Sequence, residues 1–197
     1  MPITETADDH AQRRFQELVE RHLGSLLRFA RRRSATLSDA EDAVQEACLR
    51  AWMAFSDLRD ETRVRAWLYR ILRTVLSDGL ARDGRRLRLA GTTPIDDVPE
   101  TELASESDVV FTEVMARLSR EAVHDALATL PHDFAAAVEM HDIDGLKYHE
   151  VAEALDVPLG TVMSRLSRGR RMLARAVSMR GGSPSVAEQR LVSLRRG

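Results

Sequence analysis

The sequence predicts an all-α protein made of two small helical domains joined by an acidic linker. Apolar residues recur every three or four positions through residues 8–82 and again through 120–179, which is the period of helices laid on a core. Residues 83–119 lose this period and accumulate glycine, proline, serine and threonine, as linkers do. We therefore expect domains at 8–82 and 120–179, a linker at 83–119 and a tail at 180–197.

Charge is distributed unevenly along the chain, although the 197 residues sum to only -2. Seven acidic residues and no basic one lie from Gly91 to Glu113, whereas six arginines and no acidic residue lie from Val157 to Arg180. Charge-free stretches fall far short of the roughly 18–20 apolar residues that cross a bilayer, and the first residues lack the apolar core of a signal peptide. We expect a cytoplasmic protein without membrane insertion.

Three helices are predicted in the first block. Ser38 and Glu41 have the spacing of a capping box and are expected to begin the second helix, and Thr62 is expected to cap the third. The lone cysteine, Cys48, is interpreted as a small buried apolar residue that cannot form an internal disulfide. The residues expected to face the core are Phe15, Leu18, Val19, Leu23, Leu26, Leu27 and Ala30 in the first helix, Val44, Ala47, Cys48, Ala51, Trp52 and Phe55 in the second, and Trp67, Leu68, Ile71, Leu72, Val75 and Leu76 in the third.

The second block has the pattern of a helix-turn-helix. A helix from Arg120 stops before Pro131, and another runs from about His132 to Asp144–Gly145. From Tyr148 onward, small and apolar residues face inward, and Asp156 stands where the turn requires a left-handed backbone. The last helix is expected to begin after Pro158 and to continue to about Val177. A further short helix is expected over 109–118.

The last helix has the chemistry of a DNA-binding element. Its polar residues lie at spacings of three and four, so that most project from one side: Thr161, Ser164, Arg165, Arg168, Arg171 and Arg175. The major groove admits a helix, and hydroxyl and guanidinium groups reach phosphates and base edges there. A charge run is usually a solvated face, but here all charges have one sign over 24 consecutive residues. Docking on an acidic protein surface is the other interpretation.

Catalytic and metal-binding patterns are missing from the sequence. It has no glycine-rich phosphate loop, no serine or cysteine nucleophile motif and no pair of acids in a catalytic setting. The six histidines do not have the spacing of known ligand sets. We expect neither an enzyme nor a cofactor or metal site.

Three strings, in this order, resemble a known family, the extracytoplasmic-function (ECF, group IV) sigma factors of bacterial RNA polymerase, within the sigma-70 family. Asp39-Ala-Glu-Asp-Ala-Val-Gln-Glu-Ala-Cys-Leu-Arg-Ala-Trp52 resembles the polymerase-binding helix. Arg65-Ala-Trp-Leu-Tyr-Arg-Ile-Leu-Arg73 resembles the helix that handles the minus-10 promoter element. Leu127 to Pro131, Asp144 to Ala152 and Gly160 to Arg171 resemble the domain that reads the minus-35 element. The first block is then sigma region 2 and the second sigma region 4.

This resemblance implies a transcription initiation factor that directs core polymerase to promoters and helps to open them. Its partners are then promoter DNA, the clamp helices of the largest polymerase subunit, the flap of the second-largest subunit and an anti-sigma factor. The linker is implied to thread toward the active-site cleft, where its negative charge mimics nucleic acid. An unstacked base is implied to be held by the loop from Ser56 to Thr62 and the start of the next helix.

The resemblance also implies a role for individual residues. The residues implied to bind core polymerase are Asp39, Asp42, Gln45, Glu46 and Arg50; those implied to bind the minus-10 element are Arg63, Arg65, Trp67, Arg70 and Arg73; and those implied to bind the minus-35 element are Thr161, Met163, Ser164, Arg165, Ser167, Arg168 and Arg171. Trp67 has a second interpretation as a core residue. Met163 departs from the arginine frequent in the family, so the base preference cannot be transferred.

Two other functions fit the residues. A stand-alone regulator would bind duplex operators as a dimer through the same helix-turn-helix, without a polymerase. A helical adaptor would use its arginines on an acidic protein partner.

Overall fold

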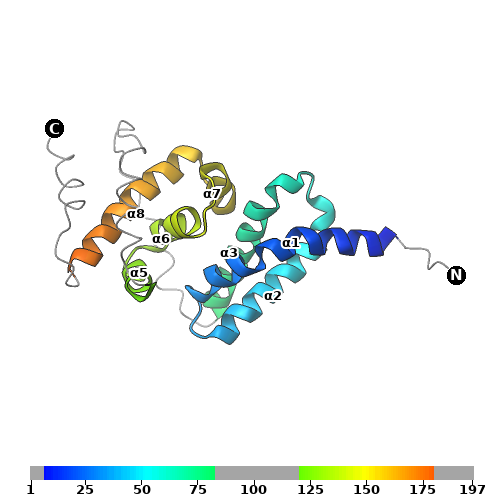
Figure 1. Ribbon diagram of the computed structural model, residues 1–197, viewed down its shortest axis with the longest axis horizontal. Coiled ribbons are helices and arrows are strands. Elements are labelled where there is room, and N and C mark those ends of the chain that lie inside the picture. Colours follow the sequence, from blue (N-terminus) through cyan, green and yellow to red (C-terminus); the bar gives the residue numbers. More distant parts are fainter. Residues whose placement is uncertain (1–6, 83–119, 180–197) are drawn as a thin grey trace. The chain divides into compact units, whose positions relative to one another are not determined.

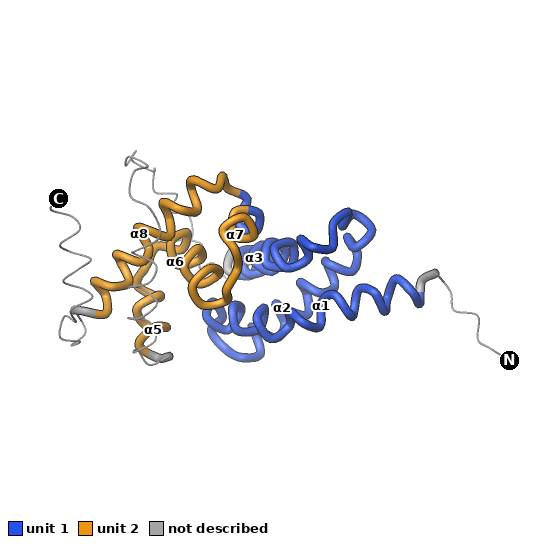
Figure 2. Tube along the Cα trace, turned by 45° about the horizontal axis from the view of Figure 1, so that its top comes forward, with its two compact units in different colours: residues 1–86, 153–156 blue, residues 87–152, 157–197 orange. Residues whose placement is uncertain are grey.

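The computed structural model of the protein describes residues 7–82 and 120–179. The predicted linker, the helix expected over 109–118 and the tail lie outside the described residues. Every regular element within these two ranges is a helix, which confirms the predicted fold class, and none of them is long and apolar enough to span a membrane. The chain divides into two compact units, residues 1–86 with 153–156 and residues 87–152 with 157–197, which Figure 2 shows in blue and orange.

Three long helices build the first unit, with two short 3-10 turns between the second and the third. They are α1 (Ala7–Arg31), α2 (Leu37–Met53), η1 (Phe55–Asp57), η2 (Glu61–Arg63) and α3 (Val64–Arg82). Each of the long helices packs against the other two, so that they enclose one core (Figure 1). The largest fully buried side chains of this core are Tyr69, Phe29, Leu26, Leu68 and Leu72.

The buried stripe of α1 is centred differently from the prediction. Phe29 is fully buried in edge-to-face contact with Tyr69, the ring centroids lying 5.2 Å apart, and neither aromatic was among the predicted core residues. Leu23, which was predicted to be in the core, is exposed. It lies at the edge of a stripe centred on Leu26 and Phe29, where the neighbouring helices do not cover it.

The start of α2 also corrects the prediction. The capping box uses Thr36 and Asp39 rather than Ser38 and Glu41. The Asp39 backbone N–H donates to Thr36 Oγ1 at 3.1 Å, and the Thr36 N–H donates to the Asp39 carboxylate at 3.0 Å. Ser38 and Glu41 lie inside the helix on its exposed side. Both pairs have the required spacing, and the earlier start lets the helix bury Ala40 within its first turn.

The entry into α3 differs in the same way. Thr62 does not cap α3 but lies within η2, whose cap is Asp60. The Asp60 carboxylate accepts from the Thr62 backbone N–H at 3.0 Å and from its hydroxyl at 2.7 Å. These two hydrogen bonds lower the pKa of Asp60, because they favour its charged form.

The second unit is built on a pair of closely packed helices, α6 and α8. Its elements are α5 (Arg120–Leu127), α6 (His132–Val138), the π-helical turn η4 (Glu139–Ile143), α7 (Tyr148–Leu155) and α8 (Leu159–Met179). α8 packs against α6 and α5. At Gly169 the backbone of α8 comes so close to α6 that an added Cβ would lie 2.7 Å from Val138 Cγ2. The predicted end of the second helix near Gly145 is confirmed, and that glycine has a φ of 72°.

Candidate nucleic-acid and protein interfaces

α7 and α8 form the predicted helix-turn-helix. Asp156, directly after α7, has a φ of 57°, the left-handed conformation expected from its place in the turn. The start of α7 is capped by Glu150, whose carboxylate accepts from the Lys147 backbone N–H at 2.6 Å. Val151 and Leu155 of α7 and Val162 of α8 are buried. The turn at Asp156 therefore separates α7 from α8.

α8 has an apolar inner side and a polar outer side. Val162, Leu166 and Leu173 are buried. Met163, Arg171 and Arg175 are exposed, and Thr161, Ser164, Ser167 and Arg168 are partly exposed. The Ser164 hydroxyl donates to the Thr161 carbonyl at 3.0 Å. Most residues predicted to contact the minus-35 element therefore share one accessible face, and no acidic residue lies in the first turn of this helix.

Arg165 differs from the other predicted DNA-binding residues because it has a partner within the unit. Its guanidinium lies 2.8 Å from the carboxylate of Asp133 on α6, and only 15% of its side chain is exposed. Arg165 thus ties the start of α8 to the start of α6.

Arg170 was given no role from the sequence, and it forms a buried ion pair with Asp142 of η4. Its Nε and Nη2 atoms donate to the two carboxylate oxygens of Asp142, at 3.0 and 2.6 Å. The two side chains are only 7% and 9% exposed. Burial raises the pKa of Asp142 to about 7 and lowers the pKa of Arg170 to about 10, because the charged forms lose hydration. An arginine within the apolar stripe of a helix is the sequence signal that indicates such a partner.

The residues predicted to contact the minus-10 element fall into two groups on α3 and its entry. Arg63, Trp67 and Arg70 follow one another at helical spacing on the outer side, where Arg63 and Arg70 are exposed and Trp67 is half-buried. Arg65 and Arg73 lie nearer the core side and are half-buried. The burial of Trp67 is therefore compatible with both interpretations, as a core residue and as a DNA contact, because the side chain is partly buried and partly accessible.

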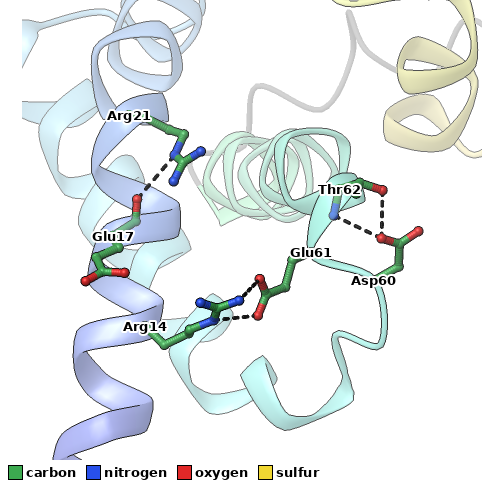
Figure 3. Close-up of polar contacts among 6 residues, drawn as sticks. All are labelled: Arg14, Glu17, Arg21, Asp60, Glu61 and Thr62. Atoms are coloured by element: carbon green, nitrogen blue, oxygen red, sulfur yellow. Dashed lines mark hydrogen bonds and ion pairs between the residues drawn. The ribbon is translucent and has the colours of Figure 1, made fainter.

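The loop between α2 and α3 is held to α1 at both of its ends. Phe55 at its start packs edge-to-face on Phe15, with ring centroids 5.2 Å apart, and stacks on Trp52. Glu61 near its end accepts two hydrogen bonds from Arg14, one of them from Nε at 2.8 Å (Figure 3). Trp52 and Phe55, predicted as core, are only half-buried.

The outward side of α2 carries the residues predicted to bind polymerase. Asp42 and Gln45 are exposed, and Glu46 accepts from Arg50 at 2.8 Å. Arg50 also donates to Asp78 of α3 at 3.0 Å, and its hydrogen bonds to Glu46 and then to Asp78 raise its pKa. The Asp39 carboxylate is used in the capping box of this helix.

Two apolar residues of α2 were missed from the sequence. Leu49 and Met53 are 60% and 76% exposed. They continue the line of Asp42 and Gln45 at spacings of four, and that spacing is the signal that could have found them. We call Asp42, Gln45, Glu46, Leu49 and Met53 the α2 outer stripe. Cys48, predicted to be buried, is half-buried, and burial raises the pKa of its thiol.

The chain matches two parts of one protein family. Residues 18–86 match Sigma-70 region 2, and residues 120–173 match Sigma-70, region 4. The chain is 37% identical over 162 residues to the ECF RNA polymerase sigma factor SigM of Mycobacterium tuberculosis, covering 82% of this chain and 76% of that protein. It is 36% identical over 168 residues to the ECF RNA polymerase sigma factor SigE of Mycolicibacterium smegmatis, covering 85% of this chain and 63% of that protein. It thus spans slightly less than two thirds of that SigE.

Two solved structures are similar in fold. The sigma factor RpoE of Bartonella quintana, in complex with the anti-sigma factor NepR, is 25% identical with a TM-score of 0.63, covering 83% of this chain and 96% of that one. CnrH, in complex with the cytosolic domain of CnrY, is 27% identical with a TM-score of 0.61, covering 86% and 91%. Fold, helix-turn-helix and sequence matches together define a helical transcription factor. The chain belongs to the ECF RNA polymerase sigma factors, which are transcription initiation factors.

Proposed function

We propose that this chain binds core RNA polymerase through the α2 outer stripe, reads the minus-10 element with α3 and the loop before it, and reads the minus-35 element with the outer side of α8. The observation that carries the proposal is the division of α8 into an apolar inner side and an accessible outer side with arginines and hydroxyls, directly after a left-handed turn. This geometry fits a helix seated in the major groove.

Within α8 we assign contact with DNA to Met163, Ser164, Ser167, Arg168 and Arg171. Arg165 is assigned a supporting role, because Asp133 holds its guanidinium against α6. Replacing Arg168 or Arg171 with alanine should cost about 1–3 kcal/mol if the residue reads a base, and should weaken all sequences equally if it contacts phosphate. Arg21→Ala, which removes an exposed arginine from α1, is the matched control.

The α2 outer stripe combines two acids, an amide and two exposed apolar side chains, the composition of a protein interface rather than of a solvated helix face. We assign it to the clamp helices of the largest polymerase subunit, and α8 and its unit to the flap of the second-largest subunit. Asp42→Lys should weaken the affinity for core polymerase while leaving the fold intact, because the side chain is exposed. Glu20→Lys, an exposed reversal on α1, should not.

Control by an anti-sigma factor is also part of the proposal. It is supported by the similarity to RpoE, whose solved structure contains the anti-sigma factor NepR. An inhibitor that covers Leu49 and Met53 would compete with core polymerase for the same apolar surface. A purified inhibitor should then displace the wild-type chain from core polymerase, and Met53→Asp should weaken its binding.

The deciding experiment is run-off transcription with purified core polymerase over a library of genomic fragments. The proposal predicts new start sites when the chain is added, and no tight duplex binding by the chain alone. A stand-alone regulator predicts the opposite, sequence-specific gel shifts without core enzyme. An adaptor predicts that Arg168→Ala leaves transcription unchanged. Absence of any start-site selectivity would refute the proposal.

A further inference from the structure

We infer that Arg14 is a positioning residue for the loop that receives the unstacked minus-10 base, acting with Phe15 as a two-point brace. This inference rests on the proposed function of that loop. Arg14 and Phe15 lie on α1, a helix to which the proposed function assigns no contact with DNA. Arg14 precedes residues 18–86, which match Sigma-70 region 2, so the brace lies outside the matched part of the chain.

The loop cannot be held by a core of its own. Neither η1 nor η2 contains a buried residue, and Ser56, Asp57, Arg59, Asp60 and Thr62 are all exposed. Backbone N–H groups of Asp57, Leu58 and Arg63 donate to Ala54, Phe55 and Asp60, each three residues earlier in the chain. A loop of this kind is ordered chiefly by contacts that its ends make with neighbouring helices.

Adjacent residues of α1 supply those contacts. Phe15 packs against Phe55 at the start of the loop, with ring centroids 5.2 Å apart. Arg14 donates Nε and Nη2 to the two carboxylate oxygens of Glu61 at the end of the loop, which is the bidentate geometry that fixes both distance and orientation (Figure 3). Both ends are therefore fixed to a single turn of one helix, and the exposed residues between them are held as an arch.

Inside the arch, the polar side chains are oriented as well. Asp60 accepts from both the amide and the hydroxyl of Thr62, so its carboxylate closes the turn next to Glu61 (Figure 3). Thr62 directly precedes Arg63, and the outer side of α3 begins there. A loop fixed before binding loses less conformational freedom when it takes up a base, and it keeps its polar groups at fixed positions for discrimination between bases.

The test uses Arg14→Gln with Arg21→Gln as its matched control. Arg21 is an exposed arginine of the same helix, but its Nε donates to the Glu17 carbonyl of α1 itself and not to the loop (Figure 3). Both variants remove one positive charge from α1, so a general loss of attraction for DNA affects them alike. Only Arg14→Gln releases Glu61.

The assay is made on the full chain bound to core polymerase. The probe is a fork-junction DNA from a promoter found by run-off transcription, with either its own base or an abasic site at the unstacked minus-10 position. We expect Arg14→Gln to lower the ratio of the two affinities by about two- to fivefold, because a loop that is not fixed before binding must be ordered when it takes up the base. Core-polymerase affinity and melting temperature should stay at wild-type values, and Arg21→Gln should keep the wild-type ratio. A residue with only a structural role would change the melting temperature but not this ratio.

The charge-swapped double variant Arg14→Glu/Glu61→Arg restores an ion pair at the same place and should recover part of the ratio. The inference is overturned if Arg14→Gln keeps the wild-type ratio, or if Arg21→Gln lowers it equally. Fork-junction binding by Arg70→Ala shows whether only the brace is wrong or whether the proposed function of the loop is wrong as well. If Arg70→Ala weakens fork-junction binding and Arg14→Gln does not change the ratio, only the brace is wrong. If the wild-type holoenzyme does not distinguish the two probes, the proposed role of the loop fails, and the brace fails with it.

Discussion

Removing the negative charge from the ion pair between Asp142 and Arg170 should strongly destabilise the second unit. Asp142→Asn keeps the size of the side chain but removes the negative charge that the Arg170 guanidinium, 7% exposed, pairs with. Breaking a buried ion pair in this way costs about 3–5 kcal/mol. A helical unit of this size has a stability of about 3–9 kcal/mol, at about 0.05–0.15 kcal/mol per residue over residues 120–179. The loss therefore removes from about a third to all of the available stability.

Hydrogen exchange of the full chain, followed by mass spectrometry, measures this loss separately in each unit. Amides of α6, α7 and α8 should lose most of their protection in Asp142→Asn, and amides of α1 to α3 should not change. Asp133→Asn is the matched control, because its ion pair with Arg165 is more accessible and should contribute less than about 1 kcal/mol.

The double variant Asp142→Leu/Arg170→Met completes the test of the buried pair. It replaces both charges with apolar groups and should recover most of the protection, since a buried pair replaced by apolar residues is often close to neutral. Equal protection losses in Asp142→Asn and Asp133→Asn would show that burial of the pair does not determine its contribution.

Three further predictions follow from single positions. Gly169→Ala should destabilise the second unit by about 1–3 kcal/mol, because its Cβ would lie 2.7 Å from Val138 Cγ2; an unchanged urea midpoint would contradict the close approach. Thr36→Ala should cost about 0.5–2 kcal/mol in urea unfolding, and Ser38→Ala should cost much less; the reverse order would refute the observed capping box. Alkylation of Cys48 should be slow at pH 7 and should accelerate at a higher pH than alkylation of an unburied thiol, because burial raises its pKa and keeps the unreactive thiol; fast reaction at pH 7 would contradict this.

Local features of the fold could be predicted from the sequence. The helical period, the stop before Pro131 and the left-handed turn at Asp156 each depend on a few neighbouring residues, and the structure has all three. The start of α2 was predicted wrongly because two neighbouring pairs of residues both have the spacing of a capping box. Thr36 with Asp39 and Ser38 with Glu41 both fit a capping box, and only packing of the helix on its neighbours selects the first.

Pairings between distant residues could not be predicted from the sequence. Arg170 and Asp142 are separated by 28 positions, and Arg14 and Glu61 by 47. Periodicity shows which side of a helix is apolar but not which residue of another helix lies opposite it. The predicted polymerase-binding set likewise omitted Leu49 and Met53, which were assigned neither to the core nor to an interface and which are exposed.

The close approach at Gly169 has a consequence for the evolution of promoter preference. A helix seated with its backbone against a neighbour cannot rotate or slide by one residue without a clash, so the phase of the outward side chains on α8 is locked. In the proposed function, substitutions at Met163 or Ser167 would then alter the surface offered to DNA without disturbing the packing behind them. The proposed DNA-facing side of α8 can then change one side chain at a time, while the packing of α8 on α6 stays constant.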